Sequence, residues 1–140
     1  MLALILDAII PADPQLGMPS AASIGFDGYV TRYGLQDTVD RYTTLVADLA
    51  QEKQGQSFAT LTAQTRLDVI NTSRTKDIRL FSSVVTHVLR AYYSHRDVLS
   101  RISHDAVPPF PDGNMLESDD WTLLEPVYER GPIYRQVQSP

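Results

Sequence analysis

The feature that most constrains the fold is a run of apolar residues in the middle of the chain that repeats with helical period. Steps of three, four, three and four place five side chains on one helix face: Ile78, Phe81, Val85, Val88 and Tyr92. Leu80, Val84 and Leu89 widen this face. A sector this wide predicts a central helix that is packed on more than one side.

Weaker stripes of the same period predict further helices on both sides of this segment. We expect them over the ranges 2–10, 20–33, 37–53, 62–73 and 97–102. Gly34 and Gly55 follow two of these segments and are typical helix stops. No segment has the alternating pattern of a strand. The predicted fold class is therefore all-α, an irregular bundle of five or six helices with an extended Pro-rich C-terminal arm.

The composition changes sharply after the last of these segments. Four residues that interrupt helices and central strands lie close together: Pro108, Pro109, Pro111 and Gly113. We therefore expect residues 1–105 to form the helical bundle and residues 106–140 to form the arm. One short helix is expected in the arm, beginning near Ser118 and kept short by Pro126.

The arm is too rich in aromatic and aliphatic residues for a free tail, so we expect it to pack on a partner protein. Aromatic side chains supply much of the binding energy at such interfaces. The expected interface residues are Tyr92, Tyr93, Pro108, Pro109, Phe110, Pro111, Trp121, Tyr128 and Tyr134. The alternative is that the arm folds back on its own helices, because core packing uses the same aromatic residues.

Composition excludes several classes of partner and site. The formal net charge is −5 and no cluster of Lys and Arg occurs, which argues against nucleic acid as the partner. The absence of cysteine removes disulfides and Cys-based metal sites. The apolar start ends at Pro11, whereas a membrane span needs roughly 18 or more apolar residues, so no direct membrane insertion is expected.

The same start lacks the positive residues of a signal peptide, because no Lys or Arg precedes Arg32. As the chain is written, we expect a cytoplasmic protein. A periplasmic location is the alternative if a leader was removed.

Asp7 is the unusual residue of the first helix, since it is a carboxylate among apolar neighbours. A buried acid is costly unless it is hydrogen-bonded or paired. We expect a structural acid that accepts hydrogen bonds from loop amides near Pro11. A catalytic role is the less favoured alternative.

Three histidines, His87, His95 and His104, lie in the second half of the chain, and acids lie close to two of them. His87 and His95 are separated by about 12 Å of helical rise, so they cannot share one metal from a single helix. The sequence also lacks a dinucleotide fingerprint, a phosphate loop, a nucleophile elbow and an HExxH motif. We therefore expect no catalytic residue, no metal and no cofactor in this chain.

Three segments together resemble one known family: ILDAIIPADP at 5–14, RAYYSHRDVLSRI at 90–102 and VPPFPDGNMLESDDWTLLEPVYERGPIYR at 107–135. They resemble the gluconate 2-dehydrogenase subunit 3 family, the small subunits of membrane-linked sugar and polyol dehydrogenases. The resemblance implies a helical accessory subunit without a cofactor. Its partner would be a large flavoprotein of the glucose-methanol-choline type that holds FAD, with a cytochrome c or another acceptor taking the electrons.

The chain departs from that family at two places. Family members often carry a twin-arginine leader, and no arginine pair precedes Ile5. His95 and Arg96 stand where the family usually shows an acid and often a proline.

Together these features predict a non-catalytic small subunit that binds, stabilises and assists the maturation of a large FAD-dependent sugar, polyol or alcohol dehydrogenase. The chain would not be an enzyme by itself. The alternatives are a stand-alone helical adaptor protein and a small enzyme that uses a histidine with an acid.

Overall fold

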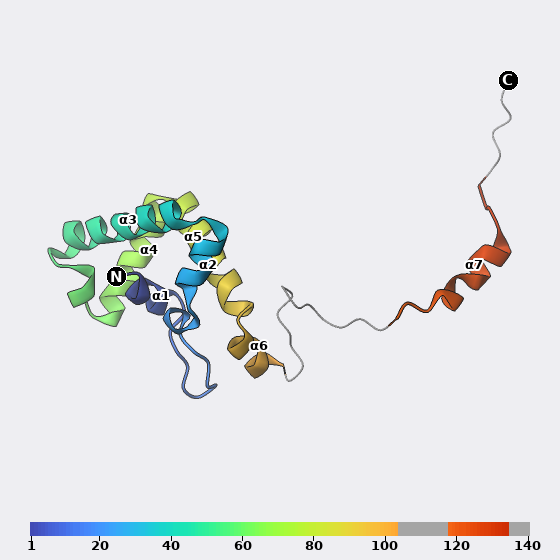
Figure 1. The fold of residues 1–140 in the computed structure, drawn as a ribbon. Coiled ribbons are helices and arrows are strands. Elements are labelled where there is room, and N and C mark those ends of the chain that lie inside the picture. Colours follow the sequence, from blue (N-terminus) through green and yellow to red (C-terminus); the bar gives the residue numbers. More distant parts are fainter. Residues whose placement is uncertain (104–117, 135–140) are drawn as a thin grey trace, which may run out of the picture.

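The computed structural model describes residues 1–103 and 118–134 of the chain (Figure 1). The α-helices in these residues are α1 (Leu2–Ile9), α2 (Phe26–Tyr33), α3 (Gln36–Gln54), α4 (Ala63–Lys76), α5 (Ile78–Tyr93), α6 (Arg96–Ile102) and α7 (Glu125–Arg130). Three 3-10 helices are η1 (Ala21–Ile24), η2 (Phe58–Thr60) and η3 (Trp121–Leu124). The described residues contain no strand beyond an isolated bridge between Asp13 and Met18, which confirms the all-α prediction.

Local interactions set the helix ends. The hydroxyl of Thr62 accepts a hydrogen bond from the amide of Thr65 at 3.2 Å and so caps α4, as its sequence position predicts. The helix expected over 20–33 is broken in two, because Gly25 adopts a left-handed φ of 71° between η1 and α2. A glycine takes this conformation without the steric cost that other residues meet.

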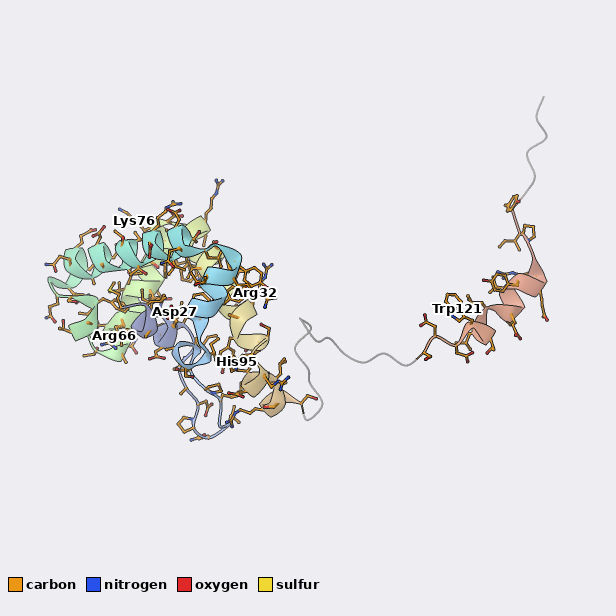
Figure 2. The ribbon with its side chains drawn as sticks, in the orientation of Figure 1. Asp27, Arg32, Arg66, Lys76, His95 and Trp121 are labelled. Atoms are coloured by element: carbon orange, nitrogen blue, oxygen red, sulfur yellow. The ribbon has the colours of Figure 1, made fainter. Side chains whose placement is uncertain are left out.

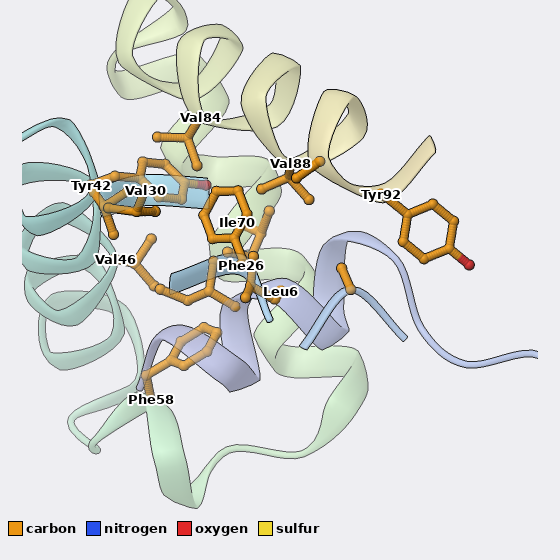
Figure 3. Close-up of a cluster of buried hydrophobic side chains, with 14 of the residues drawn as sticks. Leu6, Phe26, Val30, Tyr42, Val46, Phe58, Ile70, Val84, Val88 and Tyr92 are labelled. Carbon is orange, nitrogen blue, oxygen red and sulfur yellow. The ribbon is translucent and has the colours of Figure 1, made fainter. Parts of the chain in front are cut away.

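Helix α5 lies at the centre of the bundle, as its wide apolar sector predicts. It packs against α2, α3, α4, α6 and η1, while α1 packs against η1 and α4. Side chains from five helices and η2 converge on the core in Figure 3: Leu6, Phe26, Val30, Tyr42, Val46, Phe58, Ile70, Val84, Val88 and Tyr92. Full burial of one such aliphatic or aromatic side chain stabilises a fold by about 1.5–3 kcal/mol.

The buried face of α5 differs from the predicted stripe at one end. Ile78 is 54% exposed because it is the first residue of the helix and its neighbours leave it uncovered. Val84 is only 2% exposed, so it belongs to the core more fully than Val85, which is half-buried. The centre of the buried face therefore runs through Val84, Val88 and Tyr92.

A buried hydrogen bond explains why α4 turns a polar residue inward. The hydroxyl of Ser73 lies 2.9 Å from that of Tyr42 on α3, and it donates to the carbonyl of Ile70 at 2.7 Å. With its polar atoms satisfied, Ser73 is fully buried, whereas the apolar Leu67 of the same helix is 40% exposed.

The remaining described residues, 118–134, are called the arm segment below and include η3 and α7 (red in Figure 1). Asp120 Oδ1 accepts a hydrogen bond from the Thr122 amide at 3.1 Å and caps η3. The helix expected to begin near Ser118 and to be kept short by Pro126 corresponds to η3, which ends at Leu124, and a second short helix, α7, follows it. Pro126 lies in the first turn of α7, where the missing N–H removes no helical hydrogen bond.

The predicted boundary between residues 105 and 106 falls outside the described residues, so it stays a prediction. Among the helices that the structure describes, none is long and apolar enough to cross a membrane.

Candidate functional site

Two adjoining hollows of about 360 and 340 Å³ lie between α2 and the C-terminal turns of α5. Both are lined by Tyr29, Tyr33 and Ser94, so they form one feature, called the α2–α5 groove below. Each volume falls within the range of roughly 300–1,000 Å³ that is typical of ligand sites. The groove is the candidate functional site within the described part of the chain.

One wall of the groove is an aromatic ladder along α2. Phe26, Tyr29 and Tyr33 are spaced three and four residues apart, which places them on one face of this helix. The rings of Phe26 and Tyr29 stack with centroids 5.8 Å apart, and those of Tyr29 and Tyr33 lie 4.4 Å apart. Gly28 leaves the space beside the ladder open, since no atom lies within 4 Å of where its Cβ would stand.

A hydrogen bond fixes this wall against α5. The hydroxyl of Tyr29 lies 3.2 Å from Nδ1 of His87, although the two residues are 58 positions apart in sequence. Burial raises the pKa of the Tyr29 phenol above its ordinary value, the nearby Tyr33 raises it further, and the Arg90 guanidinium acts in the opposite direction. The phenol is therefore neutral at neutral pH, and the contact with His87 holds α2 in place.

The groove also has arginine and histidine side chains in its lining. Arg32 and His95 line one hollow and Arg90 lines the other, and no acid lines either. Arg32 is labelled in Figure 2. Its guanidinium lies 5.8 Å from the ring centroid of Tyr33, a cation–π distance. Neither Arg32 nor Arg90 forms an ion pair with any residue that the structure describes. Asp27, also on α2, lines a separate small cavity beside α1.

The predicted interface residue Tyr92 belongs to the core instead. It is 2% exposed, and its hydroxyl donates a hydrogen bond to the Pro19 carbonyl at 2.7 Å. This correction follows from the helical period, which turns Tyr92 inward and its neighbour outward. Tyr93 is 53% exposed and lines the groove, with its ring edge-on to that of Tyr92.

The arm segment exposes the aromatic residues that the sequence assigned to an interface. Trp121 is 67% exposed, Tyr128 is 72% exposed and Tyr134 is 74% exposed. Leu123 and Ile133 are equally exposed, at 75% and 76%. The other predicted interface residues, Pro108, Pro109, Phe110 and Pro111, lie outside the described residues.

The histidines do not converge on one site in the described part of the chain. His87 contacts Tyr29, and His95 Nδ1 accepts a hydrogen bond from the Asp97 amide at 3.3 Å, which caps α6. His104 lies outside the described residues. Among residues 1–103 and 118–134, no group of three or more His, Asp and Glu side chains is placed to hold a metal ion.

Asp7 does not bind the loop amides near Pro11. Its Oδ1 is buried and makes no hydrogen bond within the described residues, so the expectation of a satisfied acid is wrong for this oxygen. The amides of Gln15 and Leu16 are bound by Asp13 Oδ1 at 2.9 and 3.1 Å, because Asp13 lies in the same turn.

Arg66 lines the same small cavity as Asp7, of about 80 Å³. Its guanidinium is engaged elsewhere, since it donates to the carbonyls of Phe58 and Ala59 at 3.1 and 2.6 Å. The cavity is therefore lined by an acid with a buried, unbonded oxygen and by an arginine that binds backbone carbonyls.

Sequence reasoning missed the contribution of α2 to the groove. The available signal was a pair of tyrosines four residues apart, Tyr29 and Tyr33, with Arg32 between them in a short segment bounded by Gly25 and Gly34. The partner wall on α5 is far away in sequence, so no local pattern brings the two together.

No protein-family model, no curated protein and no solved structure matches this chain. Its function therefore has to be inferred from its own residues. Among the described residues, the groove offers aromatic faces and basic side chains to a ligand.

Proposed function

We propose that this chain is a non-catalytic small subunit that binds, stabilises and assists the maturation of a large FAD-dependent sugar, polyol or alcohol dehydrogenase. The observation that carries the proposal is the exposed apolar surface of the arm segment. Trp121, Tyr128 and Ile133 are each at least 67% exposed, within one stretch of the chain. Apolar residues gathered in this way mark protein interaction sites.

The arm segment is built as a binding element. Helix α7 packs against η3, and both helices keep their large side chains exposed. A rigid residue such as Pro126 reduces the conformational entropy that the segment loses on binding. Trp and Tyr are the residue types most often found as energetic hot spots. Trp121 and Tyr128 are therefore the proposed anchors on the partner, and Phe110 and Tyr134 would extend the contact.

The identity of the partner rests on the sequence resemblance. The segments 5–14, 90–102 and 107–135 resemble small subunits whose partners are flavoproteins of the glucose-methanol-choline type. In this proposal FAD is held by the large subunit, and a cytochrome c or another acceptor receives the electrons from the complex. The residues of this chain contribute binding surface only.

The proposal is tested by purifying an affinity-tagged chain from its native cells. We expect one large protein in equal amount, with a flavin absorption spectrum and dehydrogenase activity on a sugar, a polyol or an alcohol. A matched control is a tagged chain that ends at Asp105, which should capture none of it. Stoichiometric capture of a protein without flavin would favour the stand-alone adaptor instead.

A further inference from the structure

We propose that the acidic and aromatic head of the arm segment, residues 119–121, docks in the α2–α5 groove of the same chain when no partner is bound. The arrangement described above, with an open groove and an exposed Trp121, is then the undocked state. The inference goes beyond the proposed function, since it concerns what the arm binds within its own chain.

The two surfaces have complementary shapes and chemistry. The groove has an aromatic wall formed by Tyr29 and Tyr33, with Tyr93 on the α5 side. Indole rings pack favourably on such walls in offset or edge-on geometry. Trp121 is 67% exposed and is the sole tryptophan of the chain. Docking would cover the indole and the exposed faces of Tyr33 and Tyr93 together.

The charges of the two surfaces are also complementary. The groove carries Arg32 and Arg90 without an ion pair among the described residues, and it also carries His95. Asp119 and Asp120 directly precede Trp121. The chain as a whole is acidic, with a net charge of −5, so a groove whose lining contains two arginines and no acid is a local exception. The groove therefore favours an acidic segment that also carries an aromatic ring.

The connection between the two surfaces is long enough. The groove ends at Ser94 and His95, immediately before α6, and in the sequence 14 residues, 104–117, separate the described end of the bundle from the arm segment. A segment of this length reaches roughly 45 Å when extended. Because the head is tethered, its effective concentration at the groove is about millimolar, far above that of a second copy in dilute solution. The occupant is therefore the chain's own arm.

Docking would control when the arm binds another protein. Trp121 cannot occupy the groove and a partner surface at once, so the two contacts compete. A competing internal contact lowers the apparent affinity for a partner by the fraction of chains that are undocked. It also shields the apolar arm from unspecific association before the partner arrives.

The test uses the full-length chain alone and the fluorescence of its single tryptophan. In the native chain Trp121 should be shielded from acrylamide compared with the same chain in denaturant. The double variant Arg32→Glu/Arg90→Glu should shift the equilibrium toward release by about tenfold, the size expected when two partly exposed charge pairs are lost. The control Arg79→Glu changes an exposed arginine of α5 about 16 Å along the helix and should leave the shielding unchanged.

A charge swap makes the test specific to this contact. Asp119→Arg should release Trp121 in the native background and restore shielding in the Arg32→Glu/Arg90→Glu background. Asp119→Arg changes only the arm segment, so the shielding of Trp121 in this variant tests the contact even where the groove variants disturb the helices. Equal quenching of Trp121 in the native chain, the double variant and the denatured chain overturns the proposal.

A second result would also overturn the proposal. If the shielding of Trp121 rises with protein concentration and sedimentation shows a dimer, the arm docks in the groove of a second copy. The experiment contains no flavoprotein. Absence of Trp121 shielding would therefore not contradict the proposed function. In the same way, failure to capture a flavoprotein would not contradict docking of the arm.

Discussion

The helical bundle and the arm segment are both rich in large apolar residues, but the bundle buries these side chains and the arm segment exposes them. In the bundle, Val46, Phe58 and Val88 are at most 1% exposed. In the arm segment, Trp121 and Ile133 are at least 67% exposed. The difference lies in spacing, because the bundle repeats its apolar residues with helical period over long segments and the arm does not. Composition alone does not decide whether a residue is buried.

The largest expected effect is on stability, and it compares the alanine replacement of one aromatic residue in the bundle with that of one in the arm segment. Phe58→Ala should lower the free energy of unfolding by about 3–5 kcal/mol, because it removes a fully buried ring and leaves a cavity. Trp121→Ala should cost about 1 kcal/mol or less, because the proposed contact with the α2–α5 groove lies at the surface and its loss leaves no cavity in the core. Urea unfolding followed by circular dichroism measures both. Equal losses in the two variants would show that the arm belongs to the core.

The next effect concerns assembly instead of folding. If Trp121 anchors the partner, Trp121→Ala should weaken the complex by roughly 2 kcal/mol or more, which is typical of a hot spot. Removal of residues 106–140 should abolish the complex while the helices of the remainder persist. Calorimetry with the purified large subunit gives the affinities. Unchanged affinity for either variant would move the interface away from the arm.

The buried Tyr42–Ser73 pair offers a smaller effect within the bundle. Ser73→Ala leaves the Tyr42 hydroxyl without its partner and should cost about 1–3 kcal/mol. The double variant Tyr42→Phe/Ser73→Ala should be less destabilised than the sum of the two single changes. A strictly additive result would mean that the 2.9 Å contact contributes nothing to stability.

The same pair predicts a pH dependence at alkaline pH. Burial raises the pKa of Tyr42 above its ordinary value, and the hydrogen bond with Ser73 acts in the opposite direction. A raised pKa in the folded state means that the neutral phenol stabilises the fold fully below the unfolded pKa, near 10. That contribution is lost as pH rises through the folded pKa. Unfolding free energies measured from about pH 8 to 11 should therefore fall less steeply in Tyr42→Phe than in the native chain.

A still smaller effect is expected at Asp7. Because its Oδ1 is buried without a hydrogen bond, Asp7→Asn removes the charge at nearly constant shape and should change stability by about 1 kcal/mol at most, toward a more stable chain. Thermal unfolding at low and high salt measures it. A large loss would reveal a charged partner for Asp7.

The smallest expected effect is on turnover. Alanine replacement of His87, His95 or His104 should leave the activity of the proposed complex within about twofold, because effects from general acid–base residues are typically a hundredfold or more. Steady-state assays of the purified complex test this. A loss of that size at one histidine, with helicity intact, would support the small-enzyme alternative.

Much of the helical layout could be predicted because its causes are local. The apolar stripe of α3 is Val39, Tyr42, Leu45, Val46 and Leu49. All of these are buried as the spacing predicts except Leu45, which is half-buried, and α3 ends at Gly55 in a left-handed conformation. The thirteen-atom hydrogen-bonded ring of a helix and its caps involve residues close in sequence. A single sequence therefore contains the information for them.

The errors fall where distant residues decide. The helical stripe already places Tyr92 on the inner face and leaves Tyr93 exposed, but the hydrogen bond from the Tyr92 hydroxyl to the Pro19 carbonyl joins residues 73 positions apart. The burial of Ser73 depends on Tyr42, 31 positions earlier. Neither partner is visible in a local pattern.

The sequence by itself determined an all-α chain with helix ends at its glycines and polar caps, because these depend on backbone preferences and contacts within a few residues. Only the tertiary structure decided that Tyr29 and Tyr33 of α2 meet Tyr93 and Arg90 of α5 to form a basic aromatic groove. That arrangement depends on the contact between Tyr29 and His87 across 58 positions. Such a pairing forms only when the whole core closes, so no segment read alone contains it.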